Sequence, residues 1–230
     1  MLRTYILNNR DYYEQAYSGG YGIQYPEGHV IRVFNKILKG DLGLPAKQGS
    51  RLFDFGCGNG THARFFFENG FDVYGMDVSE TAIAACKARL PEIQDQFFIA
   101  QPDPANNPEL EQRFDVALAN QVLYFLSPTD MRHSVDYLYH HMHPGAVLVA
   151  TMVGTKNYYY NYATAQQDGL HRVELPTGKT LHIQFTADRD ELIDKFRPFE
   201  PMHIGYYDSV IYEREGSGFH FLYVGRKPQG

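Results

Sequence analysis

The sequence predicts an α/β fold in which a mostly parallel sheet is covered by helices on both faces. Short, continuously apolar segments alternate with segments of helical periodicity over about 100 residues, a pattern typical of parallel strands that are buried on both sides. A glycine-rich turn follows the first of these strands and leads into a helix. Near the C-terminus, two strand-like segments flank a polar turn, which predicts an antiparallel pair at the end of the sheet.

The composition is that of a globular protein, and we expect one domain over residues 1–230. Hydrophobic residues make up 43% of the chain and charged residues 21%. No apolar segment approaches the roughly 18 residues of a membrane span, and the N-terminus lacks signal-peptide organisation, so we expect a cytoplasmic protein. Cys57 and Cys86 fit free thiols, and no Cys/His cluster has zinc spacing, so no metal is expected. The net charge of −6, without a dense basic run, argues against nucleic acid as a partner.

Periodicity and capping residues define the elements of the first half of the chain. Residues 1–25 are polar and rich in tyrosine, and apolar residues then share one helical face from His29 onward. Gly70 fits a helix C-terminus, and Ser79 fits an N-cap. The predicted elements here are helices at 29–38, 61–69 and 79–90, and strands at 51–55, 71–77 and 97–100.

The second half of the chain completes the alternation and then departs from it. The turn at Pro144 and Gly145 separates a helix from a strongly apolar strand. Residues 152–185 then form an insertion that contains a hairpin, and the chain ends in two further strands around a glycine-containing turn. The predicted elements here are helices at 128–141 and 188–196, strands at 114–119, 146–151, 203–212 and 219–225, and the hairpin strands at 172–175 and 180–185.

The glycine-rich turn at Gly56, Gly58 and Gly60 is the most informative feature for function. Glycines let a ligand approach the backbone closely, and the free N–H groups of the following helix point toward that ligand. A dinucleotide fingerprint would place its third glycine one residue later, but its ribose-binding acid is matched by Asp77, at the end of the second strand. The spacing of the glycines and the acid therefore leaves open both a dinucleotide and a ligand of another class.

Several motifs taken together resemble the class I S-adenosylmethionine-dependent methyltransferases. They are the Asp54-x-Gly56-x-Gly58-x-Gly60 turn, Asp77 closing the second strand, Asp103 after the third, the segment from Phe114 to Leu123, and the turn from His143 to Ala146. The resemblance is strong over residues 51–150. It implies a Rossmann-like, mostly parallel seven-stranded sheet with helices on both faces and an antiparallel last strand.

The resemblance also implies a set of contacts with S-adenosylmethionine and its product S-adenosylhomocysteine. The glycines would pass against the methionine part and ribose, Asp54 would face the ammonium group, and Asp77 would accept both ribose hydroxyls. Asp103 would receive the adenine amino group. The expected cofactor-binding residues are Asp54, Gly56, Cys57, Gly58, Gly60, Asp77, Val78, Gln101, Asp103, Ala119 and Asn120.

The acceptor is expected to be a small or sugar-like molecule, methylated by in-line displacement. Amide and exocyclic-amine methyltransferases of this fold carry Asn or Asp followed by Pro-Pro and an aromatic residue, whereas this chain has Asn120-Gln121-Val122-Leu123. By resemblance, residues 1–45 supply an N-terminal lid and helix, and the insertion at 152–185 caps the acceptor site. The expected substrate contacts are Tyr17, Tyr21, Tyr158 and Tyr162, and candidates for a catalytic base or acid are His29, Tyr124 and His171.

Two other functions remain open at the level of sequence. A nicotinamide-dependent oxidoreductase could use a similar fold, although the early third glycine and the antiparallel last strand count against it. A non-catalytic cofactor-binding module is also possible, because methyl transfer requires no strong catalytic signature. The sequence leaves the acceptor and the oligomeric state open.

Overall fold

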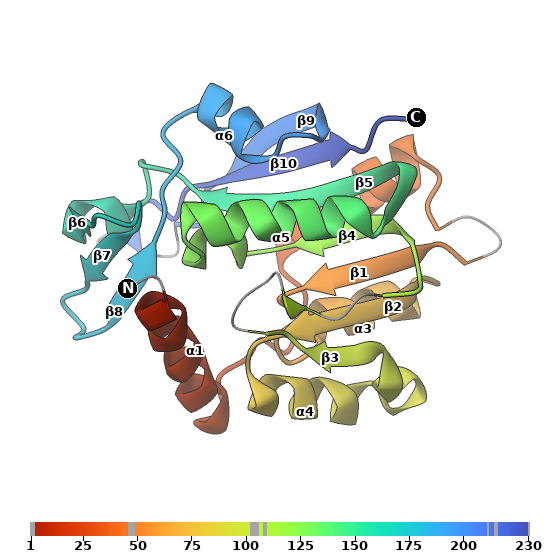
Figure 1. Ribbon diagram of the computed structural model, residues 1–230, viewed down its shortest axis with the longest axis horizontal. Coiled ribbons are helices and arrows are strands. Elements are labelled where there is room, and N and C mark those ends of the chain that lie inside the picture. Colours follow the sequence, from red (N-terminus) through yellow and green to blue (C-terminus); the bar gives the residue numbers. More distant parts are fainter. Residues whose placement is uncertain are drawn as a thin grey trace.

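A central seven-stranded sheet organises the chain in the computed structural model, which describes residues 3–45, 49–101, 106–107, 110–210, 212–213 and 216–229 (Figure 1). The strands lie in the order β3-β2-β1-β4-β5-β10-β9. Their bounds are β1 (Arg51–Phe55), β2 (Asp72–Asp77), β3 (Phe97–Ile99), β4 (Phe114–Ala119), β5 (Met142–Val153), β9 (Glu200–Tyr207) and β10 (His220–Arg226).

The sheet is parallel except for one strand. β1 pairs in parallel with β2 and with β4, and β2–β3 and β4–β5 are also parallel. β10 runs antiparallel to both of its neighbours, β5 and β9. The predicted fold class, a Rossmann-like mixed sheet with an antiparallel last strand, is therefore confirmed. The long β9–β10 hairpin starts three residues earlier than predicted, at Glu200.

Helices cover both faces of the sheet, as predicted, because successive strand residues point to opposite sides. In β1, Leu52 packs into one apolar cluster and Phe53 into the other. One face is covered by α5 and α6, and the other by α2, η1, α3 and α4 (Figure 1). The bounds are α2 (Gly28–Val33), the π-helix η1 (Phe34–Asp41), α3 (Thr61–Glu68), α4 (Glu80–Arg89), the 3₁₀ segments η2 (Pro91–Gln96) and η4 (Leu123–Phe125), α5 (Pro128–His140) and α6 (Arg189–Lys195).

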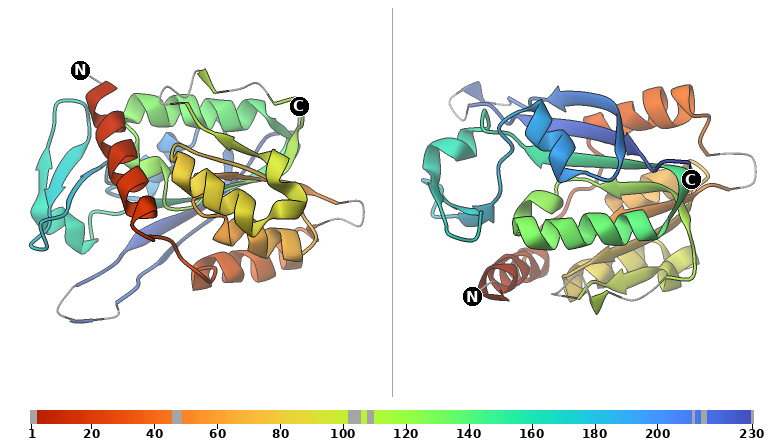
Figure 2. Two further views of the ribbon diagram at one scale, coloured as in Figure 1. Left: turned by 90° about the horizontal axis from the view of Figure 1, so that it is seen from below. Right: turned by 45° about the horizontal axis from the view of Figure 1, so that its top comes forward.

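The tyrosine-rich N-terminal segment forms a helix, α1 (Arg3–Ser18), that the sequence analysis did not assign. The helix lies between α4 and the small sheet described below (Figure 2). Glu14 on α1 accepts a 2.6 Å hydrogen bond from the Ser79 hydroxyl and another from Thr81. Asn9 donates to the carbonyl oxygens of Phe125, at 2.9 Å, and His182, at 3.3 Å. Contacts distant in sequence therefore hold this helix in place.

The insertion after β5 forms a second, three-stranded antiparallel sheet. Its elements are the 3₁₀ turn η5 (Tyr158–Tyr162), β6 (Ala163–Ala165), β7 (His171–Glu174) and β8 (Thr180–Ile183). The predicted hairpin corresponds to β7 and β8, and β6 is an additional strand. The sheet packs on the outer side of α1, where the Lys179 ammonium lies 4.9 Å from the ring centroid of Tyr12.

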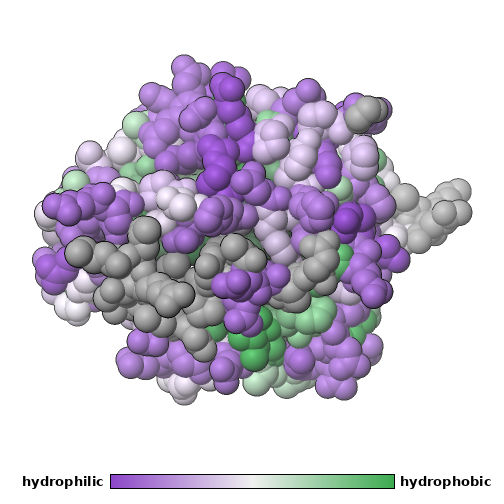
Figure 3. Space-filling model, in the orientation of Figure 1, coloured by the Kyte–Doolittle hydropathy of each residue, from purple (hydrophilic) through white to green (hydrophobic). Residues whose placement is uncertain are grey.

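The surface seen in Figure 3 is mostly hydrophilic. Among the helices of the described residues, none is both long and apolar enough to cross a bilayer.

Candidate functional site

The turn between β1 and α3 can be made only by residues that tolerate a left-handed backbone. Gly56, Gly58 and Gly60 have φ values of 78°, 53° and 78°. A Cβ at Gly56 would lie 2.5 Å from a methyl group of Val122, and one at Gly60 would lie 2.5 Å from the sulfur of Cys86. Glycine at these two positions therefore lets the turn pack closely against Val122 and Cys86.

Two carboxylates, those of Asp77 and Asp54, lie next to this turn. Asp77, which ends β2, accepts hydrogen bonds from the backbone N–H groups of Gly58 (2.9 Å) and Ser79 (3.0 Å). Burial raises the pKa of Asp77, and these N–H donors oppose the rise. Asp54 is 2% exposed in β1, and burial, assisted by the negative charge of Asp77, raises the pKa of Asp54 to about 7. Among the described residues, Oδ2 of Asp54 has no hydrogen-bond partner.

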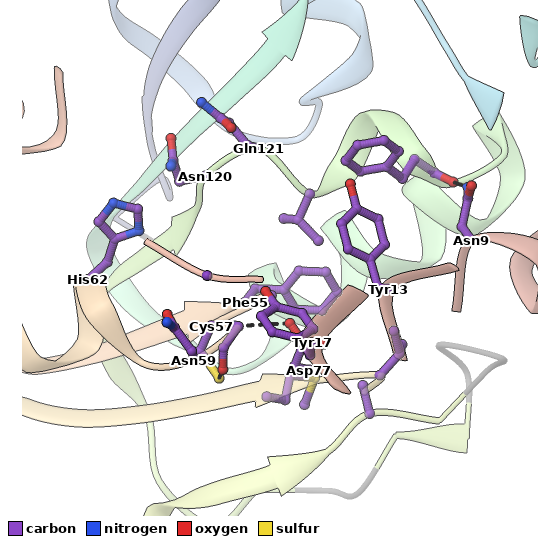
Figure 4. Close-up of a pocket in the computed structure, with 18 of the residues that line it drawn as sticks. Asn9, Tyr13, Tyr17, Phe55, Cys57, Asn59, His62, Asp77, Asn120 and Gln121 are labelled. Carbon is purple, nitrogen blue, oxygen red and sulfur yellow. Dashed lines mark hydrogen bonds between the residues drawn. The ribbon is translucent and has the colours of Figure 1, made fainter. Parts of the chain in front are cut away.

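A cleft opens above the turn, at the carboxyl ends of the parallel strands, where α/β sheets bind ligands. Its empty space, including the open mouth, is about 1350 Å³. In Figure 4, Tyr17 and Asp77 lie at one side of the cleft, His62, Asn120 and Gln121 at another, and Tyr13 opposite them.

Tyrosines of α1 and of the segment just after it form one wall of the cleft. The rings of Tyr17 and Tyr21 lie edge to face with centroids 5.4 Å apart, and Tyr13 packs on Phe125 at 5.3 Å. The Tyr17 hydroxyl lies over the glycine turn, because a Cβ at Gly58 would come within 2.5 Å of it. Burial raises the pKa of Tyr13, Tyr17 and Tyr21, so these hydroxyls stay protonated and can donate hydrogen bonds.

The opposite wall is polar and centres on Glu27, just before α2. Oε2 of Glu27 accepts from Nδ2 of Asn120 and Oε1 accepts from Nε2 of Gln121, both at 2.8 Å. The Glu27 backbone N–H donates to Nε2 of His62 at 3.4 Å. Burial lowers the pKa of His62 to about 4, so this imidazole is neutral at physiological pH.

Two half-buried neighbours, His29 and Tyr207, support this polar wall from behind. Nε2 of His29 lies 2.8 Å from Oδ1 of Asn120, and the His29 ring stacks on Tyr207 with centroids 3.9 Å apart. Gln121 also donates to the Tyr207 hydroxyl at 3.0 Å. Gln121 has a φ of 55°, the only left-handed value among the described residues other than glycine. Such strain persists only where the surroundings hold it, and it is common at functional sites.

The structure brings most of the predicted site residues together. Within the described part of the chain, the predicted residues that line the cleft are Tyr17, Tyr21, Gly56, Cys57, Gly58, Asp77, Val78, Gln101, Asn120 and Tyr124. Asp103 falls outside the described residues.

Other predicted residues lie away from the cleft surface. Asp54 is buried in β1 beneath the turn, Gly60 is buried at the end of the turn against Cys86, and Ala119 is fully buried in β4. His29 stands behind Asn120 and does not line the cleft.

The insertion does not reach the cleft surface. Tyr158 and Tyr162 belong to η5, which leads away from the sheet edge into β6, and Tyr162 is 41% exposed. His171 packs against Tyr160 and Phe185 in the small sheet. The expected acceptor-site cap therefore contacts α1 from outside, and its residues are not among the described residues that line the cleft.

The lining residues that the sequence analysis missed as site residues include Tyr13, Glu27, His62 and Gln121. Tyr13 stands among tyrosines that the sequence did mark as an aromatic segment. Glu27 and His62 carry no local signal, because 93 residues separate Glu27 from its partner Asn120. The signal available for Gln121 was its place after β4, beside Asn120.

Comparison with known proteins identifies the domain. Residues 53–148 match a family model described as a methyltransferase domain. Over 108 residues the chain is 31% identical to malonyl-[acyl-carrier protein] O-methyltransferase of Enterobacter lignolyticus (strain SCF1). This match covers 47% of the chain and 41% of that relative, so it spans less than half of the relative's length.

Solved structures share the fold. The 1,6-didemethyltoxoflavin-N1-methyltransferase of Burkholderia thailandensis, solved with 1,6-didemethyltoxoflavin and S-adenosylhomocysteine, superimposes with a TM-score of 0.69 at 18% identity, covering 99% of this chain and 91% of that one. The [4+2]-cyclase SpnF superimposes with a TM-score of 0.63 at 20% identity, covering 100% of this chain and 94% of that one. The strand order and the glycine turn agree with the family match, which identifies residues 53–148 as a class I S-adenosylmethionine-dependent methyltransferase domain.

Proposed function

We propose that this protein transfers a methyl group from S-adenosylmethionine to a small-molecule acceptor by in-line displacement. The observation that carries the proposal is the cleft at the carboxyl ends of β1, β2 and β4, where the glycine turn and Asp77 meet. The family match of residues 53–148 and the methyltransferase relative support the same reaction.

The residues present fit the cofactor. An ammonium group would give the buried Oδ2 of Asp54 the charged partner that it lacks among the described residues, directly or through water. The Asp77 carboxylate lines the cleft and has lone pairs beyond those that accept from Gly58 and Ser79, so it can also accept ribose hydroxyls. Met76 and Val78 supply an apolar surface for the adenine.

The main task of the protein in methyl transfer is to orient the acceptor toward the methyl group. When bound, S-adenosylmethionine supplies an electrophilic methyl group, and the protein must hold the acceptor in line with it while excluding water. Tyr13, Tyr17 and Tyr21 form an aromatic wall that suits a sulfonium cation and the faces of a sugar-like acceptor. We propose sugar-like and other small polar molecules as acceptors on this basis.

Calorimetry with S-adenosylhomocysteine and with NAD tests the cofactor. We expect S-adenosylhomocysteine to bind and NAD to show no heat of binding. The reverse result would reject the methyltransferase function in favour of a nicotinamide enzyme.

One comparison favours a second candidate. The [4+2]-cyclase SpnF is a structural neighbour whose name describes a reaction other than methyl transfer. Incubating the protein with methyl-labelled S-adenosylmethionine and metabolite extracts separates the two. Label in a small-molecule product supports methyl transfer. Silence across extracts, with S-adenosylhomocysteine still bound, supports a role in which the cofactor is retained but not consumed.

A further inference from the structure

We propose that Glu27 is the proton acceptor of the reaction and that the methyl acceptor attacks through a hydroxyl or an amine that loses a proton to it. The inference rests on the proposed function and adds to it a catalytic residue and a class of acceptor. Glu27 reaches the cleft from the N-terminal segment, outside all the motifs that mark the family resemblance.

The Glu27 carboxylate is held in place and yet open to the cleft. The Asn120 and Gln121 amides occupy one lone pair on each oxygen, so a second lone pair on each remains to accept a proton. The side chain is 30% exposed, which gives the proton a route to water.

A network of neighbouring side chains fixes the orientation of this carboxylate. Since Asn120 donates through Nδ2, its Oδ1 accepts from His29, and the His29 ring is clamped by Tyr207. Gln121 is held by Tyr207 as well, and by a 2.8 Å hydrogen bond from its own N–H to the Thr151 hydroxyl. The strained backbone of Gln121 and the stack of His29 on Tyr207 both help to hold the Glu27 carboxylate in one orientation. This arrangement indicates that the carboxylate is pre-organised for catalysis.

The position of Glu27 matches the transferable methyl group better than the other parts of the cofactor. β1 lies between β2 and β4, so a cofactor with its ribose at Asp77 runs over the glycine turn toward Asn120. Glu27 follows the segment fixed over that turn, where the Ile23 carbonyl accepts from Nδ2 of Asn59 at 3.0 Å. In the proposed function the ammonium group faces Asp54, the carboxylate buried beneath the turn.

The neighbouring histidines are poorer bases in this geometry. His62 uses Nε2 to accept from the Glu27 backbone, and its pKa of about 4 makes it a weak base. Nε2 of His29 donates to Asn120, and His29 is not among the described residues that line the cleft. His29 is therefore a positioning residue.

The charge of the cleft selects the acceptor. Among the described residues that line it, Glu27 and Asp77 are carboxylates and there is no Lys or Arg. A phosphate or carboxylate acceptor would enter this site unpaired, whereas a neutral hydroxyl compound or an amine would not. In the step, the acceptor O–CH₃ or N–CH₃ bond forms as the CH₃–S bond breaks. The electron pair stays on sulfur, and the acceptor proton moves to Glu27.

Sinefungin tests where the Glu27 carboxylate lies. In this analogue a carbon bearing an amine replaces the methylated sulfur, so its ammonium occupies the place of the transferable methyl group. We expect the wild-type chain to bind sinefungin about tenfold more tightly than S-adenosylhomocysteine, because a charged hydrogen bond to Glu27 is gained. Glu27→Gln should abolish this preference and leave the affinity for S-adenosylhomocysteine unchanged. Glu68→Gln, on the exposed side of α3, should change neither affinity.

Each other outcome is decisive. An equal sinefungin preference in wild type and Glu27→Gln would overturn the inference while the proposed function stands. A loss of S-adenosylhomocysteine affinity in Glu27→Gln, with 5′-methylthioadenosine binding unchanged, would mean that Glu27 holds the amino-acid part of the cofactor instead. Failure of both ligands to bind wild type would refute the proposed function as well. If Glu27→Gln does not fold, Glu27→Ala provides the same comparison.

Discussion

Replacing Asp54 by Asn tests the claim that this buried carboxylate is destabilising when charged and would be stabilised by a cationic group of the ligand. The Asp54 pKa rises from 3.8 to about 7, mainly through burial. A difference of about 3 pH units corresponds to about 4 kcal/mol between charged and protonated forms. Since Asn is nearly isosteric with the protonated acid, Asp54→Asn should remove most of this cost above pH 7; the hydrogen bond from the Ala63 N–H is already included in that pKa.

The sign of the pH dependence follows from the two pKa values. Between pH 4 and pH 7 the folded state holds a proton on Asp54 that the unfolded chain releases, so wild-type stability falls as pH rises through this range. We expect urea denaturation to show Asp54→Asn more stable than wild type by about 3 kcal/mol at pH 8, with the difference vanishing near pH 4. His62 titrates in both proteins, so it cancels in the comparison.

The same substitution should weaken cofactor binding. At pH 8, Asp54→Asn should bind S-adenosylhomocysteine less tightly than wild type although its free form is more stable. Asp115→Asn is a matched control in β4, whose carboxylate accepts the Arg51 N–H at 2.8 Å. That variant should lose stability at pH 8 and keep its affinity. A stability difference for Asp54→Asn that does not change with pH would refute the reasoning.

Three further predictions concern the turn, the ribose and α1. Asp77→Ala should weaken S-adenosylhomocysteine binding by about 1–3 kcal/mol in calorimetry, the scale of lost charged hydrogen bonds; unchanged affinity in a folded variant would mean that the ribose lies elsewhere. Gly60→Ala should destabilise the protein by about 1–3 kcal/mol in urea denaturation, because φ is 78° and the new Cβ meets the Cys86 sulfur; a neutral effect would contradict the turn geometry. Glu14→Ala should speed hydrogen exchange in α1 and not in α5, because the contacts with Ser79 and Thr81 are lost; equal protection of α1 in the wild type and in Glu14→Ala would show that these bonds do not hold α1.

Sequence patterns predicted the sheet and the glycine turn because both are local. Each strand is a short apolar run. Gly56, Gly58 and Gly60 occupy positions where the backbone is left-handed, a conformation that glycine adopts readily. The strand ends then follow from the fold, so the sequence alone could place Asp77 and Asn120 at one edge of the sheet.

Elements held by distant contacts could not be predicted in this way. α1 is polar and has only a weak apolar face, and its position depends on bonds such as that from Ser79 to Glu14, 65 residues away. Glu27 became part of the site through Asn120 and Gln121, which no sequence period connects to it. The tyrosines of η5 were expected beside the cleft because they follow β5, but the direction of a loop after a strand is set by tertiary packing.

A crystal structure of the protein with S-adenosylhomocysteine tests the central claim most directly. We predict the nucleoside in the cleft above Gly56 and Gly58, its ribose hydroxyls within hydrogen-bond distance of the Asp77 carboxylate, and its ammonium on the side of Asp54. A complex with the ligand elsewhere, or with Asp77 turned away from the ribose, would contradict the account.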